Sequence, residues 1–224
     1  MFSRLFKQWK WKRLARQLRR PAGNAGKETG ILMNRSNHYM YQFTLEQMQL
    51  KDGDQVLEIG FGNGHFFPQV LSAAENLRLY GIDYSPLMVE ETRRANSNLI
   101  QNGQLQLING NSDALPYPDQ YFDVIFCINV IYFWDQPEDH LKEIRRVLKT
   151  GGRFFATCRS KENMALMPFT RWNFKPYTAD EWETELKKNK LTPFLKESAI
   201  EAGFQDLQLP IEPRQWCVGA TRSD

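Results

Sequence analysis

The chain has 224 residues, 42% hydrophobic and 25% charged, which suffices for one α/β domain with additional helices, and no apolar run approaches the ~20 residues of a membrane-spanning helix. The net charge is only +3, and eight of the 29 Lys and Arg residues lie within residues 1–20, so the broad basic surface of a nucleic-acid enzyme is not expected. The three cysteines (Cys127, Cys158 and Cys217) form no CxxC pair, which disfavours a disulfide framework and a zinc site and favours a reducing, intracellular compartment.

Residues 1–20 contain no acid and are expected to form a basic amphipathic helix. Apolar residues recur at helical spacing between the Lys and Arg residues: Phe2, Leu5, Phe6, Trp9, Leu14 and Leu18. The simplest interpretation is a helix packed on the domain or loosely tethered to it. The alternatives are weak contact with a membrane surface and a docking arm of an RNA or protein methyltransferase. No secretory signal is expected, and the single Ser argues against a transit peptide.

After this helix, PAGNAGKETG (21–30) is expected to be a Gly/Pro linker, followed by a helix at 36–50. Short apolar strands then alternate with helices, with strands expected at 55–60, 77–83, 105–110, 121–130 and 153–158 and helices at 64–75, 85–99 and 137–149. This alternation predicts a parallel sheet with right-handed crossovers. Further helices are expected at 177–190 and 195–204, and two final strands at 204–210 and 215–222.

The run EIGFGNG, from Glu58 to Gly64, directly follows the first expected strand. Glycine tolerates positive φ and close approach of a ligand, and ligands bind at the carboxyl ends of strands in open α/β sheets. The G-x-G-x-G spacing is one residue shorter than the dinucleotide fingerprint, and the preceding acid suits a cationic ligand better than a pyrophosphate. An ordinary strand-to-helix turn is the alternative.

EIGFGNG resembles the first motif of the class I S-adenosylmethionine (SAM)-dependent methyltransferases, in the small-molecule branch related to the ubiquinone and menaquinone C-methyltransferases. The resemblance spans roughly residues 30–158. It implies an α/β fold with a Rossmann-like, doubly wound, mostly parallel seven-stranded sheet and an N-terminal helical extension. It also implies SAM as cofactor, with the methionine part of SAM against Gly60, Phe61, Gly62 and Gly64 and its amino-acid end placed with help from Glu58.

Two further motifs carry the resemblance. In YGIDYSP, Asp83 ends a strand and can accept hydrogen bonds from both ribose hydroxyls, although an acid before a helix cap is the alternative; Tyr84 would lie beside the adenine. NGNSDALPY resembles the family stretch GDAxxLP, which places Asn111 where the family has an acid. An Asn carbonyl can still accept from the adenine amino group, with the backbone N–H of Ser112 on a ring nitrogen; Asp113 is the rival candidate.

Asn129 ends the fourth strand and is expected to face the cofactor. The expected pocket walls are rich in aromatic residues, which suits a planar or apolar acceptor: His38, Tyr39, Tyr41, Asn129, Tyr132, Trp134, Phe169, Trp172, Phe174 and Tyr177. In-line methyl transfer needs a base only if the nucleophile must lose a proton. His38 and Tyr132 are the candidates for an acid–base role or for orienting the acceptor, whereas His65 and His140 are expected on the surface. No metal site is expected.

These observations predict a cytoplasmic enzyme that moves a methyl group from SAM to a small-molecule acceptor, with peripheral attachment to a membrane as one alternative for residues 1–20. The N-terminal segment, residues 1–50, would comprise the basic helix, the linker and a lid helix. Residues 51–224 would form the SAM-binding domain, with an acceptor lid inserted around 160–195. The alternatives are a catalytically silent SAM-binding scaffold, and an RNA or protein methyltransferase that uses residues 1–20 as a docking arm.

Overall fold

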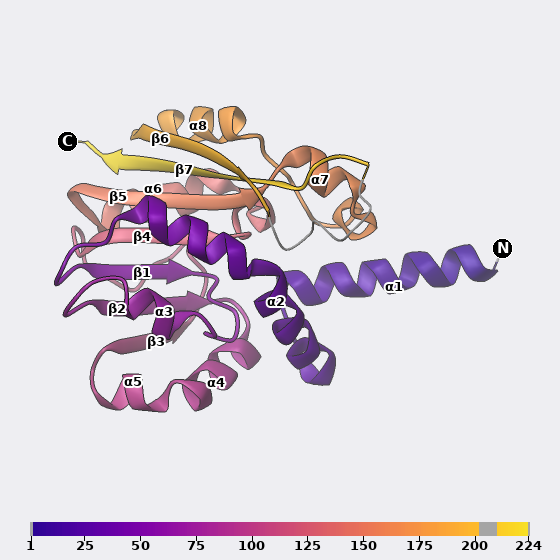
Figure 1. Ribbon diagram of the computed structural model, residues 1–224, viewed down its shortest axis with the longest axis horizontal. Coiled ribbons are helices and arrows are strands. Elements are labelled where there is room, and N and C mark those ends of the chain that lie inside the picture. The colour runs from indigo at the N-terminus through magenta and orange to yellow at the C-terminus, as the bar shows by residue number, and fades with distance from the viewer. Residues whose placement is uncertain (1, 202–209, 224) are drawn as a thin grey trace.

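A seven-stranded sheet forms the centre of the computed structural model, which describes residues 2–201 and 210–223 (Figure 1). The strand order is β3-β2-β1-β4-β5-β7-β6. The strands are β1 (Gln55–Ile59), β2 (Arg78–Asp83), β3 (Leu105–Asn109), β4 (Phe122–Ile128), β5 (Leu148–Arg159), β6 (Leu191–Ile200) and β7 (Arg214–Arg222). The first five are parallel and β7 is antiparallel to both of its neighbours. The predicted doubly wound, mostly parallel sheet is confirmed.

The central strands are buried on both faces, as parallel strands require. Helices on one face are α2 (Gly23–Met48), α3 (Phe67–Leu71) and α4 (Pro86–Ala95), with α5 (Ser97–Gln101) beside them; α6 (Pro137–Val147) and α8 (Ala179–Lys188) cover the other. Side chains alternate between the two faces along β1, so Val56 packs in the core under α2, α3 and α4, and Leu57 packs in the core under α6 and α8. The elements α7 (Lys161–Leu166), η1 (Ile131–Phe133) and η2 (Pro168–Arg171) complete the fold.

Local sequence signals explain several helix starts. The Ser85 side chain accepts from the backbone N–H of Met88, and Pro86 occupies the first turn of α4. Thr178 caps α8 in a reciprocal capping box with Glu181. The helix expected at 85–99 nevertheless divides at Asn96, and the one expected at 64–75 shortens to α3.

The predicted Gly/Pro linker at 21–30 was wrong, because α1 (Phe2–Arg19) is followed after three residues by the long helix α2. Glycine disfavours helix, but here it permits close packing. A Cβ on Gly26 would lie 2.8 Å from the backbone carbonyl carbon of Pro21 and 2.8 Å from the side chain of Leu87. Tertiary packing therefore outweighs the low helix propensity of this segment.

The C-terminal part also differs from expectation. The segment 195–204, predicted as a helix, begins inside strand β6, whose backbone pairs with β7 along its length. The predicted strand at 215–222 is confirmed as β7, whereas the one at 204–210 lies almost wholly outside the described residues. Strand β5 already begins at Leu148, so α6 ends at Val147, before the end of the helix expected at 137–149.

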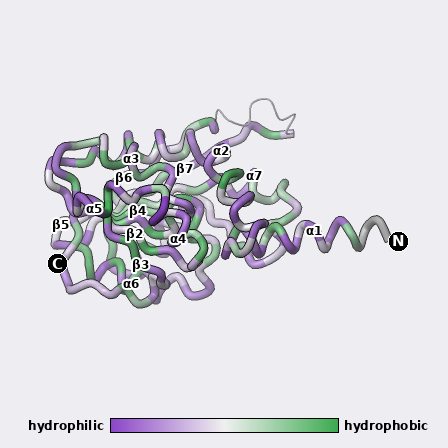
Figure 2. Tube along the Cα trace, turned by 90° about the horizontal axis from the view of Figure 1, so that it is seen from below, coloured by the Kyte–Doolittle hydropathy of each residue, from purple (hydrophilic) through white to green (hydrophobic). Residues whose placement is uncertain are grey.

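The N-terminal helices lie at the carboxyl ends of the parallel strands. Helix α2 packs on the sheet next to β4, β5 and β7 and against α4, and α1 extends from it beyond the body of the protein (Figure 1). Apolar and polar residues alternate along α1 (Figure 2). Within the described part of the chain, no helix combines the length and apolarity needed to cross a membrane.

Candidate functional site

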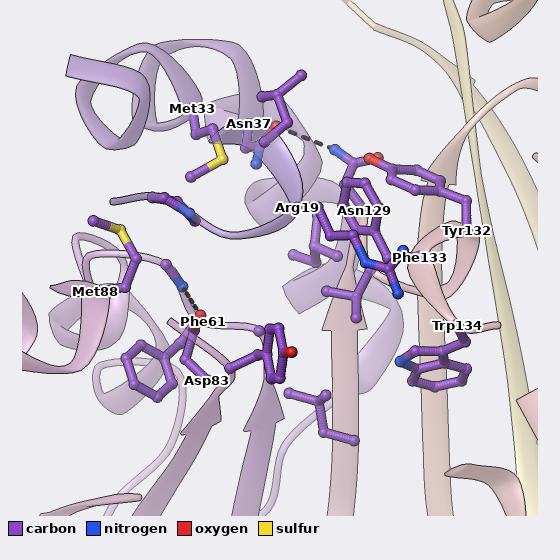
Figure 3. A pocket seen from close by; sticks show the side chains of 18 of the residues that line it. Arg19, Met33, Asn37, Phe61, Asp83, Met88, Asn129, Tyr132, Phe133 and Trp134 are labelled. Atoms are coloured by element: carbon purple, nitrogen blue, oxygen red, sulfur yellow. Dashed lines mark hydrogen bonds between the residues drawn. The ribbon is translucent and has the colours of Figure 1, made fainter. Parts of the chain in front are cut away.

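A cavity of about 550 Å³ opens where the carboxyl ends of β1, β2 and β4 meet the N-terminal helices (Figure 3). Its floor contains Gly60, Phe61, Gly62 and Asp83, which follow or end β1 and β2. Leu14, Leu18, Met33 and Asn37 from α1 and α2 close it from above. This is the crevice in which open α/β sheets bind their ligands.

The three glycines after β1 have positive φ: +75° at Gly60, +59° at Gly62 and +66° at Gly64. A Cβ on Gly60 would lie 2.5 Å from Val130, and one on Gly64 would lie 2.3 Å from Thr92. Gly62 borders the cavity, and a Cβ there would meet only Met33, at 3.7 Å. Packing requires the outer two glycines, while the middle one leaves room for a ligand. Gly64 does not line the cavity.

Asp83 is buried at the end of β2 and faces this loop. Its two carboxylate oxygens each accept one backbone hydrogen bond, at 2.9 Å from Gly62 and 2.8 Å from Ser85. Burial raises the pKa of Asp83 to about 6, against the lowering effect of those two bonds. The carboxylate is therefore charged at neutral pH. It keeps acceptor capacity for two hydroxyl groups of a ribose.

Glu58 lies below the loop and is 1% exposed, so it does not border the cavity itself. Tyr41 of α2 borders the cavity and donates a hydrogen bond to Glu58 Oε1. Glu58 Oε2 has no partner among the described residues. Burial raises the pKa of Glu58 to about 8, although the Tyr41 hydrogen bond lowers it. Glu58 is therefore mainly protonated near neutral pH, and it influences the cavity through its hydrogen bond with Tyr41.

The segment after β3 brings Asn111, Ser112 and Asp113 to the cavity wall. The Asn111 carbonyl oxygen accepts from the Ser112 backbone N–H at 3.0 Å, and its amide donates to Asp113 at 2.7 Å. Asn111 and Asp113, the two candidates for binding the adenine amino group, therefore lie next to each other. The Asn111 side chain must rotate before the backbone N–H of Ser112 can donate to a ligand. Tyr84 is half exposed, with the Arg20 guanidinium 4.3 Å from its ring centre.

The prediction that His140 lies on the surface was wrong, because its ring stacks on Trp134 with centroids 4.5 Å apart. Its Nδ1 lies 2.8 Å from the Ser112 hydroxyl. Desolvation lowers the pKa of His140, so the ring is neutral. Its position on α6, one turn after the helix start, gave no signal of this contact. His65 is exposed, as expected.

Asn129 has φ of 58° and ends β4 at the cavity. Its side-chain amide donates to Asn37 Oδ1 at 3.1 Å, which joins β4 to α2 (Figure 3). Arg159 donates to the backbone carbonyl of Ser36 at 2.6 Å and pairs with the buried carboxylate of Glu201. These contacts fix α2 as the roof of the cavity.

The far end of the cavity is mainly aromatic. Figure 3 shows Asp83 and Phe61 on one side and Tyr132, Phe133 and Trp134 on the other. Of the predicted wall residues, the structure brings together Tyr41, Asn129, Tyr132, Trp134, Phe169 and Phe174, and places His38, Tyr39, Trp172 and Tyr177 outside the lining. Burial raises the pKa of Tyr132 well above its ordinary value, so its hydroxyl stays protonated.

His38, the other catalytic candidate, is exposed on α2 with its ring beside Tyr39. No described residues form a cluster of His, Cys, Asp and Glu that could hold a metal ion. Sequence reasoning missed the cavity walls supplied by Leu14, Leu18 and Met33. Helical periodicity marked the first two as apolar, but it could not show against what they pack.

The cavity fits SAM in several respects. Gly62 leaves space beside the loop, Asp83 offers acceptors for a ribose, and the charge of Asp83 favours a cationic ligand. The residues after β3 offer both an acceptor and a backbone donor to a purine edge.

Comparisons with known proteins agree with this geometry. A family model described as a methyltransferase domain matches residues 57–156. The uncharacterized methyltransferase YdaC of Bacillus subtilis is 30% identical over 133 residues, covering 59% of this chain and 71% of that protein. The ubiquinone/menaquinone biosynthesis C-methyltransferase UbiE of Azotobacter vinelandii is 30% identical over 129 residues, covering 56% of this chain but only 50% of the relative.

Solved structures show the same fold. A chain from the complex of the Haloferax volcanii Trm112 methyltransferase activator with a methyltransferase superposes with a TM-score of 0.76 at 20% identity, covering 89% of this chain and 96% of that one. Geranyl diphosphate C-methyltransferase of Streptomyces coelicolor A3(2) gives 0.69 at 14% identity, covering 90% and 87%. At these identities the similarity concerns the fold alone.

Proposed function

Because the chain belongs to the class I SAM-dependent methyltransferases, we propose that it transfers the methyl group of SAM to an apolar small-molecule acceptor. One observation carries the proposal. A single cavity joins the glycine loop and Asp83 to an aromatic wall formed by Tyr132, Phe133 and Phe174. Donor and acceptor can therefore lie in one enclosed space, as direct transfer requires.

At the donor end, the chain's own residues would bind SAM and hold it in place. Asp83 would accept from the ribose hydroxyls, and Asn111 or Asp113 from the adenine amino group. The loop at Gly62 would contact the methionine part, and the negative charge that favours a cationic ligand would come from Asp83. When bound, SAM supplies a methyl group already activated by the sulfonium.

At the acceptor end, flat apolar side chains suit a planar or apolar compound. Phe174 lies against both Tyr132 and Phe133, with ring centroids 5.1 and 4.7 Å away. Leu14 and Leu18 of α1 would exclude water from the reacting atoms. Tyr132, which keeps its proton, would orient a polar atom of the acceptor by donating a hydrogen bond to it.

Contact between residues 1–20 and a membrane surface would agree with such an acceptor, because apolar compounds partition into bilayers. The similarity to UbiE, a C-methyltransferase of ubiquinone and menaquinone biosynthesis, supports quinone-like compounds as the first to be tested.

The test is the formation of S-adenosylhomocysteine from SAM, together with a methylated product identified by mass spectrometry, across a panel of small aromatic and quinone-like compounds. We expect turnover with at least one compound, and slower turnover by the Phe174→Ala variant. SAM binding without turnover on any small molecule would contradict the proposal and favour the scaffold alternative. Turnover on RNA or protein alone would favour the docking-arm alternative.

A further inference from the structure

Helix α1 presents different residues on two opposite faces. Residues spaced three or four apart share one face of a helix. Trp11, Leu14 and Leu18 form the inner face, toward the domain, and all three are half-buried. Four residues with the same spacing form what we call the outer face: Phe6, Trp9, Arg13 and Arg16. All four are exposed to solvent.

The inner face fixes α1 over the cavity. Leu14 and Leu18 line the cavity, and Arg19 forms an ion pair with Asp135 at 2.7 Å. Just after the helix, the carbonyl of Pro21 accepts a hydrogen bond of 2.6 Å from the Ser85 hydroxyl. The orientation of the outer face relative to the domain is therefore set by the inner face together with Arg19 and Pro21.

The outer face combines large apolar rings with positive charge. Phe6 is 66% exposed and Trp9 57% exposed, and their rings stack with centroids 6.2 Å apart. The Arg13 guanidinium lies 5.6 Å from the Trp9 ring centre. Residues 1–20 contain eight basic residues and no acid, and exposed Lys12 borders the outer face. Exposed aromatic rings gain free energy only if something covers them.

We propose that the outer face of α1 docks on an anionic lipid surface. Aromatic rings partition to the boundary between headgroups and acyl chains, while Lys and Arg approach the lipid phosphates. The remaining chain carries 21 Lys and Arg against 26 Asp and Glu. A long nucleic acid would meet that acidic body, whereas a flat membrane can contact α1 alone, because the helix extends from the domain (Figure 1).

Docking would bring the cavity close to the bilayer, because α1 provides both the lipid-binding face and a wall of the cavity. An apolar acceptor would then pass from the membrane to the aromatic wall over a short path. This consequence rests on the proposed function, whereas the docking itself does not.

The test is sedimentation of the full chain with vesicles of equimolar phosphatidylcholine and phosphatidylglycerol, with pure phosphatidylcholine vesicles as the reference. We expect binding to the anionic vesicles only, weakened by added salt. Each basic residue contributes roughly fivefold to the partition coefficient, so the double variant Lys12→Gln/Arg13→Gln should bind about 30-fold more weakly. The variant Phe6→Ser/Trp9→Ser should bind at least about tenfold more weakly, because it removes the buried apolar area.

Matched controls separate the outer face from general effects of charge and apolarity. Lys187→Gln/Lys188→Gln removes two exposed charges from α8, and Phe194→Ala removes a half-exposed ring from β6; neither should change binding. Equal loss in the controls, no vesicle binding by the wild type, or equal binding to both vesicle types would overturn the proposal. Tight binding of an RNA oligonucleotide without any binding to vesicles would also overturn the proposal. Because the assay needs neither SAM nor acceptor, failure of methyl transfer would leave its result intact.

Discussion

Glu58 should make the free energy of unfolding fall with rising pH near neutrality. Burial raises its pKa from 4.5 to about 8, so between these values the folded protein holds a proton that the unfolded chain has released. Stability from this group is complete below pH 4.5 and is lost as the pH rises toward 8. The loss is about 1.4 kcal/mol per pH unit, or about 2 kcal/mol between pH 6.5 and pH 8.

The assay is urea unfolding of the wild type and Glu58→Gln across this pH range. Glutamine keeps the shape of a protonated Glu58 but does not titrate, so its curve should be flatter by about 2 kcal/mol. Other shifted groups, including Asp83 and His140, remain in both proteins and cancel in the comparison. Parallel curves for the two proteins would refute the reasoning.

A second variant tests the role of the Tyr41 hydroxyl. Its hydrogen bond lowers the pKa of Glu58, so Tyr41→Phe should raise that pKa and extend the loss of stability above pH 8. Tyr39→Phe, on the exposed side of the same helix, is the control and should follow the wild type.

Three further predictions concern the site and its supports. Gly60→Ala should lower the free energy of unfolding in urea by about 2–3 kcal/mol, because its Cβ would lie 2.5 Å from Val130 at positive φ; a loss within 0.5 kcal/mol would contradict the packing argument. His140→Phe keeps a ring on Trp134 but loses the Ser112 contact, so SAM affinity by calorimetry should fall about fivefold to tenfold, while exposed His65→Phe should not change it. Arg159→Met leaves Glu201 buried without its charge partner and should lower the free energy of unfolding by about 3–5 kcal/mol in thermal or urea unfolding. The double variant Arg159→Met/Glu201→Leu should recover part of that loss. Equal stability of the single and double variants would contradict the argument from the unpaired charge.

Local patterns predicted the sheet well because a buried parallel strand has a short apolar sequence and its crossover helix has clear caps. The strands at 55–60 and 77–83 and the caps Ser85 and Thr178 illustrate this. Prediction failed where tertiary contacts decided the structure. Residues 23–30 look like a linker because of their glycines, yet Gly26 allows α2 to pack closely. Residues 195–200 have helix-forming composition but pair with β7.

The cofactor end of the site was more predictable than the acceptor end. Asp83 and the glycines lie next to one another because they follow neighbouring strands, so chain topology alone places them together. Leu14, Met33 and His140 reach the cavity through long-range packing that no local spacing encodes. His38 shows the converse case, since a chemically suitable side chain on the right helix faces solvent.

Calorimetric titration of SAM into the wild type and into Asp83→Ala tests the central claim most directly, with Asp119→Ala as an exposed control outside the cavity. Micromolar binding by the wild type and the control, weakened at least about tenfold in Asp83→Ala, is the predicted result. Absence of binding by folded wild-type protein, or equal affinity for Asp83→Ala, would contradict the assignment of this cavity to SAM.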